Sequence, residues 1–180
     1  MQVVTDVAGP ASRLGLPWTA GEAAMIAAAA TVDTLRAVRA MPGWSIGVGP
    51  LAGAFTDRDA PCGGTLLVAA QVPQLSPGLL ADAAGLLHEF DAVLGPTTGD
   101  GWWTFGLRAP AHGAVLRALP GALTSASSLT VAALRLGLRV AILPTLRELG
   151  SGADVPAVAG HCAAGSEFAA TVAHLTRMRS

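Results

Sequence analysis

The sequence predicts one α/β domain over residues 1–180, in which strands alternate with helices. The apolar run Thr65–Gln71 has the composition of a buried strand, and the pair Ser76-Pro77 that follows a short turn is a typical helix start. Elsewhere, short apolar runs alternate with longer segments that begin at helix caps. A length of 180 residues is typical of one domain with a substantial core.

The N-terminal part of the chain predicts one long helix between two short strands. Thr19 and Glu22 have the spacing of a capping box, in which each residue caps the backbone of the other. The helix should continue through an alanine-rich interior to Met41, because Pro-Gly follows directly. The other elements expected here are a strand at Met1–Val4, a loop over 6–17, a strand at Trp44–Val48 and a helical turn at Leu51–Phe55.

Serine caps mark the helices in the rest of the chain. The helix that begins at Ser76 should end near Phe90, and a second should extend from Ser125 to Leu136, where Gly137 ends it. The strands expected are Thr65–Gln71, Ala92–Gly95, Trp102–Leu107 and Arg139–Leu143, and the further helices are Pro110–Leu119, Asp154–Ala159 and Ser166–Met178.

Composition excludes several classes of partner. The chain is 52% hydrophobic and 13% charged, with a net charge of −1 and no lysine, so no basic stripe for nucleic acid is expected. The longest apolar run, 23–32, has 10 residues, far fewer than the roughly 20 of a membrane-spanning helix. Cys62 and Cys162 are expected to be free thiols in the cytoplasm. The low charge leaves a homodimer as one way to cover apolar surface.

Two amides, Gln71 and Gln74, stand at the end of the predicted central strand. In open α/β sheets, ligands bind outside the carboxyl ends of the strands, so this edge is where a site is expected. An amide can accept a hydrogen bond but brings no charge to hold a divalent cation against a diphosphate. The pattern indicates a nucleotide-handling fold without its metal site, although Gln71 also fits a residue that only satisfies backbone groups.

Several segments, in order, resemble a bacterial family of glycosyltransferase-A-like, short nucleotide-diphosphosugar transferase homologues, which are relatives of the MobA-like nucleotidyltransferases. The segments are Ser12-Arg13-Leu14, Asp33-Thr34-Leu35, Val72–Pro77, Val93–Pro96, Gly101–Trp103, Gly106–Arg108, Leu136–Val140 and Leu143–Arg147. The resemblance implies a Rossmann-like, three-layer α/β/α domain of the glycosyltransferase-A type with a mixed, mostly parallel sheet. It also implies that such a fold binds a nucleotide-diphosphosugar through a metal-bridged diphosphate.

The chain departs from the family pattern in the first loop and at the central strand. The family has a Lys-Thr-Arg-Leu run where this chain has Ala-Ser12-Arg13-Leu. Arg13 can still bind a phosphate with its guanidinium, or it is a solvated cation. The family's metal-ligating Asp of an Asp-x-Pro motif corresponds to Gln71. The resemblance makes Ser12, Arg13 and Gln71 candidate nucleotide-binding residues.

Two further acidic positions of the family are changed. After its Gly-Pro the family has Glu-Asp-Gly-Gly, whereas here Asp100 lies between two glycines, either shifted into the site or bonding its own backbone in a turn. The family's Arg-Asp-Val-Asp-Thr is here Arg-Glu148-Leu-Gly150-Ser, so Gly150 replaces the second Asp. Asp100 and Glu148 are the candidate catalytic residues, and no metal ligand is assigned. Mn²⁺ or Mg²⁺ is expected only if the site is rebuilt around Asp100.

One of two adjacent tryptophans is expected to line the pocket. Trp102 and Trp103 lie in a predicted strand and therefore point to opposite faces, so one can stack on a base or sugar while the other is core. Trp102 is the candidate for nucleotide binding. Asp57 and Asp59 resemble an Asp-x-Asp signature but precede the strand, and no histidine spacing predicts a metal site.

Three functions remain open on the sequence. The first is a transferase-like protein with an impaired metal site, weakly binding a nucleotide or nucleotide sugar and catalytically compromised. The second is an active glycosyltransferase or nucleotidyltransferase with a rearranged site that uses Asp100. The third is a non-catalytic partner or scaffold module.

Overall fold

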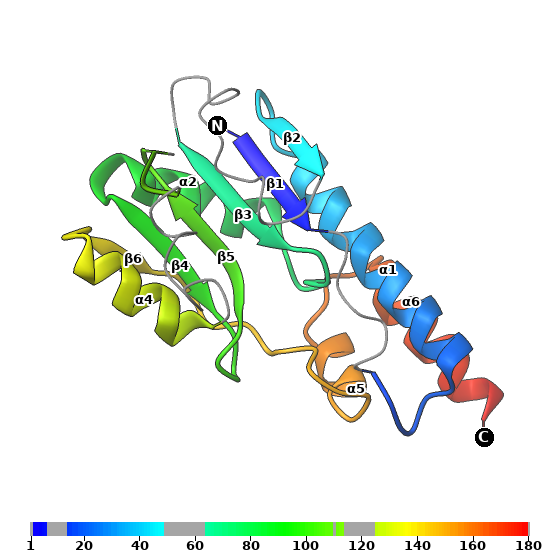
Figure 1. Ribbon diagram of the computed structural model, residues 1–180. Coiled ribbons are helices and arrows are strands. Elements are labelled where there is room, and N and C mark those ends of the chain that lie inside the picture. Colours follow the sequence, from blue (N-terminus) through cyan, green and yellow to red (C-terminus); the bar gives the residue numbers. More distant parts are fainter. Residues whose placement is uncertain (1, 7–13, 49–63, 110, 114–124, 180) are drawn as a thin grey trace.

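The computed structural model describes residues 2–6, 14–48, 64–109, 111–113 and 125–179 (Figure 1). Ser12 and Arg13, Cys62, the Asp57–Asp59 run, the expected helical turn at Leu51–Phe55 and most of the expected helix at Pro110–Leu119 lie outside these residues. Residues 111–113 of that helix are helical.

The described strands form one six-stranded sheet with the order β2-β1-β3-β5-β4-β6 (Figure 1). The strands are β1 (Gln2–Asp6), β2 (Ser45–Val48), β3 (Thr65–Ala69), β4 (Ala92–Pro96), β5 (Trp102–Leu107) and β6 (Val140–Ile142). The strand alternation therefore predicted a mixed α/β fold correctly. β3 ends two residues before Gln71, so both candidate amides lie in the turn that follows it.

The expected mostly parallel arrangement fails at the centre of the sheet. β1 pairs in parallel with β2 and β3, and β4 pairs in parallel with β6. β5, however, runs antiparallel to both β3 and β4. The reason is the connection from β4 to β5, residues 97–101, which is long enough for a hairpin but far too short for a parallel crossover.

Helix boundaries follow the caps that the sequence contains. Thr19 caps α1 in the predicted capping box, with the Thr19 N–H donating to Glu22 Oε2 at 2.7 Å. Ser76, Ser125 and Ser166 each accept a backbone N–H at the start of α2, α4 and α6. The helices are α1 (Ala20–Arg39), α2 (Pro77–Glu89), α4 (Ala126–Arg135), α5 (Val155–Ala159) and α6 (Glu167–Met178).

Helices cover both faces of the sheet, in three layers. Alternate strand residues point to opposite faces, so Leu67 and Phe105 pack against α4 around Leu129. Leu66 and Trp103 face the other way, into a core formed with α1 and α2. Burial of these two apolar faces is the main force that holds the sheet between its helices.

A third core joins α1, α5 and α6 at one end of the sheet, where α1 and α6 lie side by side (Figure 1). Ile26 and Phe168 are fully buried in it, and the Trp18 indole N–H donates to the Gly152 carbonyl at 2.9 Å. This core packs the segment that follows β6 against the N-terminal part of the chain. Among the described helices, none is both long and apolar enough to cross a membrane.

Candidate functional site

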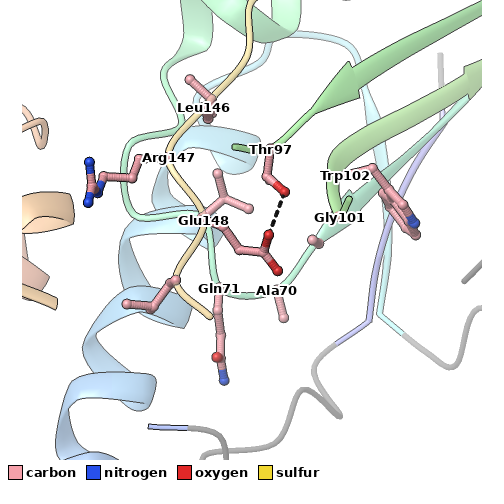
Figure 2. Close-up of a pocket in the computed structure, with 11 residues that line it drawn as sticks. Ala70, Gln71, Thr97, Gly101, Trp102, Leu146, Arg147 and Glu148 are labelled. Carbon is pink, nitrogen blue, oxygen red and sulfur yellow. Dashed lines mark hydrogen bonds between the residues drawn. The ribbon is translucent and has the colours of Figure 1, made fainter. Parts of the chain in front are cut away.

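A cavity of about 170 Å³ lies just beyond the carboxyl end of β3 (Figure 2). The turn after β3 forms one wall, the ends of the 97–101 loop form a second, and the segment after β6 forms the third. It is lined by Ala69, Ala70, Gln71, Val72, Thr97, Gly101, Trp102, Leu146, Arg147, Glu148 and Leu149. This is the edge of the sheet at which open α/β folds bind ligands.

Three of the candidate residues come together in this cavity although they are far apart in the sequence. Gln71, Trp102 and Glu148 all line it. Asp100 is not among the lining residues, and Ser12 and Arg13 lie outside the described part of the chain. The cavity therefore combines an amide, an indole ring and a carboxylate.

The Glu148 carboxylate is held in place by the 97–101 loop. The Thr97 hydroxyl donates to Glu148 Oε2 at 3.1 Å (Figure 2), and the Glu148 N–H donates to the Thr98 hydroxyl at 3.1 Å. A Cβ on Gly99 would lie 2.0 Å from Glu148 Oε2, and one on Gly101 would lie 2.7 Å from the Thr97 hydroxyl. A side chain at either position would therefore displace the Glu148 carboxylate or the Thr97 hydroxyl from this arrangement.

Gln74 holds the neighbouring backbone with its side-chain amide. Its Nε2 donates to the Arg147 carbonyl at 2.9 Å, and its Oε1 accepts the Arg147 N–H at 3.4 Å. The Arg147 guanidinium points away from the Glu148 carboxylate (Figure 2). Gln74 thus positions the segment that carries Glu148, a role that sequence reasoning missed because its partner lies 73 residues away.

The two tryptophans point to opposite faces of the sheet, as their strand position predicts. Trp103 is fully buried, and its indole N–H donates to the Pro144 carbonyl at 3.0 Å. Trp102 is half-buried, packs on the α4 side and lines the cavity. Their opposite orientations are as predicted, whereas binding of a nucleotide by Trp102 stays a prediction.

Asp100 lies at the outer side of the 97–101 loop, against the start of α4. Its carboxylate accepts the Ser127 N–H at 3.1 Å and the Ser127 hydroxyl at 2.8 Å. The Ser127 hydroxyl, then the Ser127 N–H and then the Ser125 hydroxyl lower the pKa of Asp100 below its ordinary value. The side chain is exposed. It is therefore a charged group bound to a helix start.

Two neighbouring buried residues of α1, neither assigned a role from sequence, hold other segments in place: Thr34 holds the turn after β3, and Asp33 holds the start of α6. The buried Thr34 hydroxyl accepts the Val72 N–H at 2.9 Å and donates to the Ala30 carbonyl at 2.9 Å. Asp33, also buried, accepts the backbone N–H groups at the start of α6 and the Ser166 hydroxyl. A polar pair on the apolar face of an alanine-rich helix was the signal that could have identified them.

The described residues that line the cavity offer few ligands for a divalent cation. Gln71 is neutral, and Glu148 is the one carboxylate among the lining residues. Within the described residues, no group of three or more His, Cys, Asp or Glu side chains could hold a metal ion. Mg²⁺ in proteins usually has one or two carboxylates together with substrate phosphates. Asp154, near Gly150, already accepts the Ser151 N–H and hydroxyl.

The fold and this cavity define an α/β protein with a cavity at the carboxyl edge of a mixed sheet. The chain belongs to the family described as "Uncharacterized protein conserved in bacteria (DUF2064)", whose model matches residues 18–121. No curated protein matched its sequence.

The solved structures that are similar to this one include the following two. The first is a "putative nucleotide-diphospho-sugar transferase" from Desulfovibrio desulfuricans G20, with a TM-score of 0.70 and 18% identity over 96% of this chain and 94% of that one. The second is Rv0371c from Mycobacterium tuberculosis H37Rv, with a TM-score of 0.48 and 17% identity over 87% of this chain and 95% of that one. At 18% identity, the first likeness establishes the fold.

Proposed function

We propose that this protein is nucleotide-diphosphosugar transferase-like, binds a nucleotide or nucleotide sugar weakly in the cavity beyond β3, and does so without a divalent cation. In this proposal it is compromised as a metal-dependent transferase. The observation that carries the proposal is that an amide, Gln71, and a carboxylate, Glu148, line the same cavity at the carboxyl edge of the sheet.

The position and lining of the cavity support a nucleotide-type ligand. Nucleotides bind at this edge in open α/β folds, and the similar structure from D. desulfuricans carries the name of a nucleotide-sugar transferase. Trp102, which is half-buried and lines the cavity, is the aromatic residue on which a base or sugar would stack. A volume of about 170 Å³ is below that of most ligand pockets, so the cavity fits one part of such a ligand.

The charges around the cavity support weak, cation-independent binding. A diphosphate that approached Glu148 without a cation would be repelled by its carboxylate, so binding there is expected to be weak. The Arg147 guanidinium points away from Glu148 (Figure 2). Replacement of a metal-ligating carboxylate by the Gln71 amide removes the charge that a cation bridge needs.

Calorimetric titration with UDP-, GDP-, CDP- and ADP-sugars, each with Mn²⁺ and with EDTA, tests the proposal. We expect weak binding of at least one ligand with the same dissociation constant in both conditions. Trp102→Ala should weaken that binding by about 1–3 kcal/mol if the ring stacks on the ligand. Binding that tightens tenfold or more with Mn²⁺ would contradict the metal-independent part. If none of the four nucleotide sugars binds in either condition, the proposal of nucleotide binding itself is contradicted.

The position of Glu148 favours a second candidate function, transfer or hydrolysis without a metal. Its carboxylate lies at the cavity and is oriented by Thr97, as a general acid or base has to be. Glu148→Gln would then lower turnover of a nucleotide sugar by about 10²–10⁴-fold, whereas Glu89→Gln, an exposed change on α2, would not. The version that uses Asp100 predicts that Asp100→Asn abolishes turnover, and activity that survives that change rules it out.

A further inference from the structure

The 97–101 loop, which forms one wall of the cavity, is bound on two sides. On the inner side it contacts the segment after β6: the Thr98 N–H donates to the Leu146 carbonyl at 2.9 Å, and the Thr97 hydroxyl donates to Glu148. On the outer side it contacts the start of α4, through Asp100. The loop is therefore held between two elements that are distant in sequence.

The outer contact consists of a backbone bond and a side-chain pair. The Ala126 N–H donates to the Asp100 carbonyl at 2.8 Å. The Ser127 N–H and hydroxyl donate to the two carboxylate oxygens of Asp100 at 3.1 and 2.8 Å. A carboxylate at this place is favoured by the N–H groups and the positive end of the helix dipole. The start of α4, which Asp100 contacts, is itself held in place because Ala126 and Leu129 are buried against the sheet.

We propose that Asp100 is a positioning residue of the cavity: by binding Ser127 it holds the 97–101 loop, with Gly101 and Trp102, closed against Glu148. The mutual placement of these residues carries the inference. Gly101 directly follows Asp100 and lines the cavity, and a Cβ on Gly101 would lie 3.2 Å from Glu148 Oε1. A displacement of Asp100 therefore moves the cavity wall. Any effect on ligand binding rests on the proposed function, whereas the effect on the loop does not.

Positioning and direct chemistry make different demands on position 100. Asparagine keeps one oxygen that can accept from Ser127, so Asp100→Asn should retain part of the contact. Alanine keeps none. A group that acts on the substrate as an acid or base is lost equally in both variants. The order wild type, Asp100→Asn, Asp100→Ala therefore distinguishes the two roles.

Amide hydrogen exchange, measured by NMR on the whole protein without ligand, reports directly whether the 97–101 loop is held closed. The Thr97 and Thr98 N–H groups are bonded to the Gly101 and Leu146 carbonyls and report its closure. We expect loss of protection at both amides in Asp100→Ala and in Ser127→Ala, and a smaller loss in Asp100→Asn. Because the two residues act as one unit, the double variant should lose no more than Asp100→Ala alone.

The control and the contrary results follow from the same variants. Asp82→Asn, which removes an exposed carboxylate on α2, should leave the exchange at these amides unchanged. Unchanged protection in Asp100→Ala overturns the inference, and so does a loss spread over the whole sheet, which would mean general destabilisation. If no nucleotide sugar binds the wild type, the proposed function fails while the exchange experiment still decides the role of Asp100.

Discussion

Thr34→Val tests how strongly α1 supports the cavity. Valine has nearly the shape of threonine but cannot accept a hydrogen bond, so the buried Val72 N–H loses its partner at 2.9 Å. An unsatisfied buried N–H costs about 1–3 kcal/mol. The lost bond to the Ala30 carbonyl adds little, because that carbonyl lies inside α1. We therefore expect the free energy of unfolding to fall by about 1–3 kcal/mol.

Urea denaturation measures this change, with Thr31→Val as the matched control. Thr31 lies on the same helix, is half-buried and donates its hydroxyl to the Ala27 carbonyl within that helix, so its replacement should stay within about 0.5 kcal/mol. If the free energy of unfolding falls by about 2 kcal/mol per molar urea, the urea concentration at the midpoint of unfolding should be about 1 M lower for Thr34→Val than for the wild type. Equal midpoints for the two variants would refute the reasoning, as would Thr34→Ser if it were as damaging as Thr34→Val.

Three further predictions concern packing, charge and the thiol. Gly95→Ala would bring a Cβ to 2.2 Å from the buried Trp103 ring and should lower thermal stability by at least about 1–3 kcal/mol, and a Tm equal to that of wild type would contradict this packing. The pKa of Asp91 is lowered, first by an arginine backbone N–H and also by two guanidinium groups, so its stabilisation is present above the ordinary carboxyl pKa and is lost as pH falls through the lowered one. When the free energy of unfolding is measured at decreasing pH, the wild type should show this loss of stability and Asp91→Asn should not. Identical curves for the two proteins would count against this role of Asp91. Burial raises the pKa of Cys162, so in a Cys62→Ser background iodoacetamide should label it slowly at pH 7, and rapid labelling would show that the thiol is reactive.

Local patterns in the sequence predicted much of the fold correctly. The caps at Thr19, Ser76 and Ser125 gave helix starts that the structure contains, because capping depends on residues three positions apart. The reversal of β5 was missed although the signal was present: five residues, with glycines, join two apolar runs, which is the length of a hairpin. The prediction relied instead on the parallel pairing expected of the resemblance.

The candidate site was predictable only in part, because its residues meet through long-range packing. Period-two alternation was enough to separate Trp102 from Trp103. By contrast, the contact of Asp100 with Ser127 joins residues 27 positions apart across two elements, and no spacing in the sequence indicates it. The hydrogen bond from Thr97 to Glu148 joins residues 51 positions apart, and no spacing in the sequence indicates it either.

Paramagnetic broadening by Mn²⁺ of the backbone amides that line the cavity tests the central claim most directly. The claim is that the cavity, with the neutral Gln71 amide and with Glu148 as the one carboxylate among its described lining residues, does not hold a divalent cation in the absence of a bound phosphate. In the wild type and in Gln71→Asn, we predict no selective broadening at residues 71, 97 and 148. In Gln71→Asp, which adds a second carboxylate beside Glu148, we predict selective broadening there. Selective broadening in the wild type, or none in Gln71→Asp, would contradict the claim.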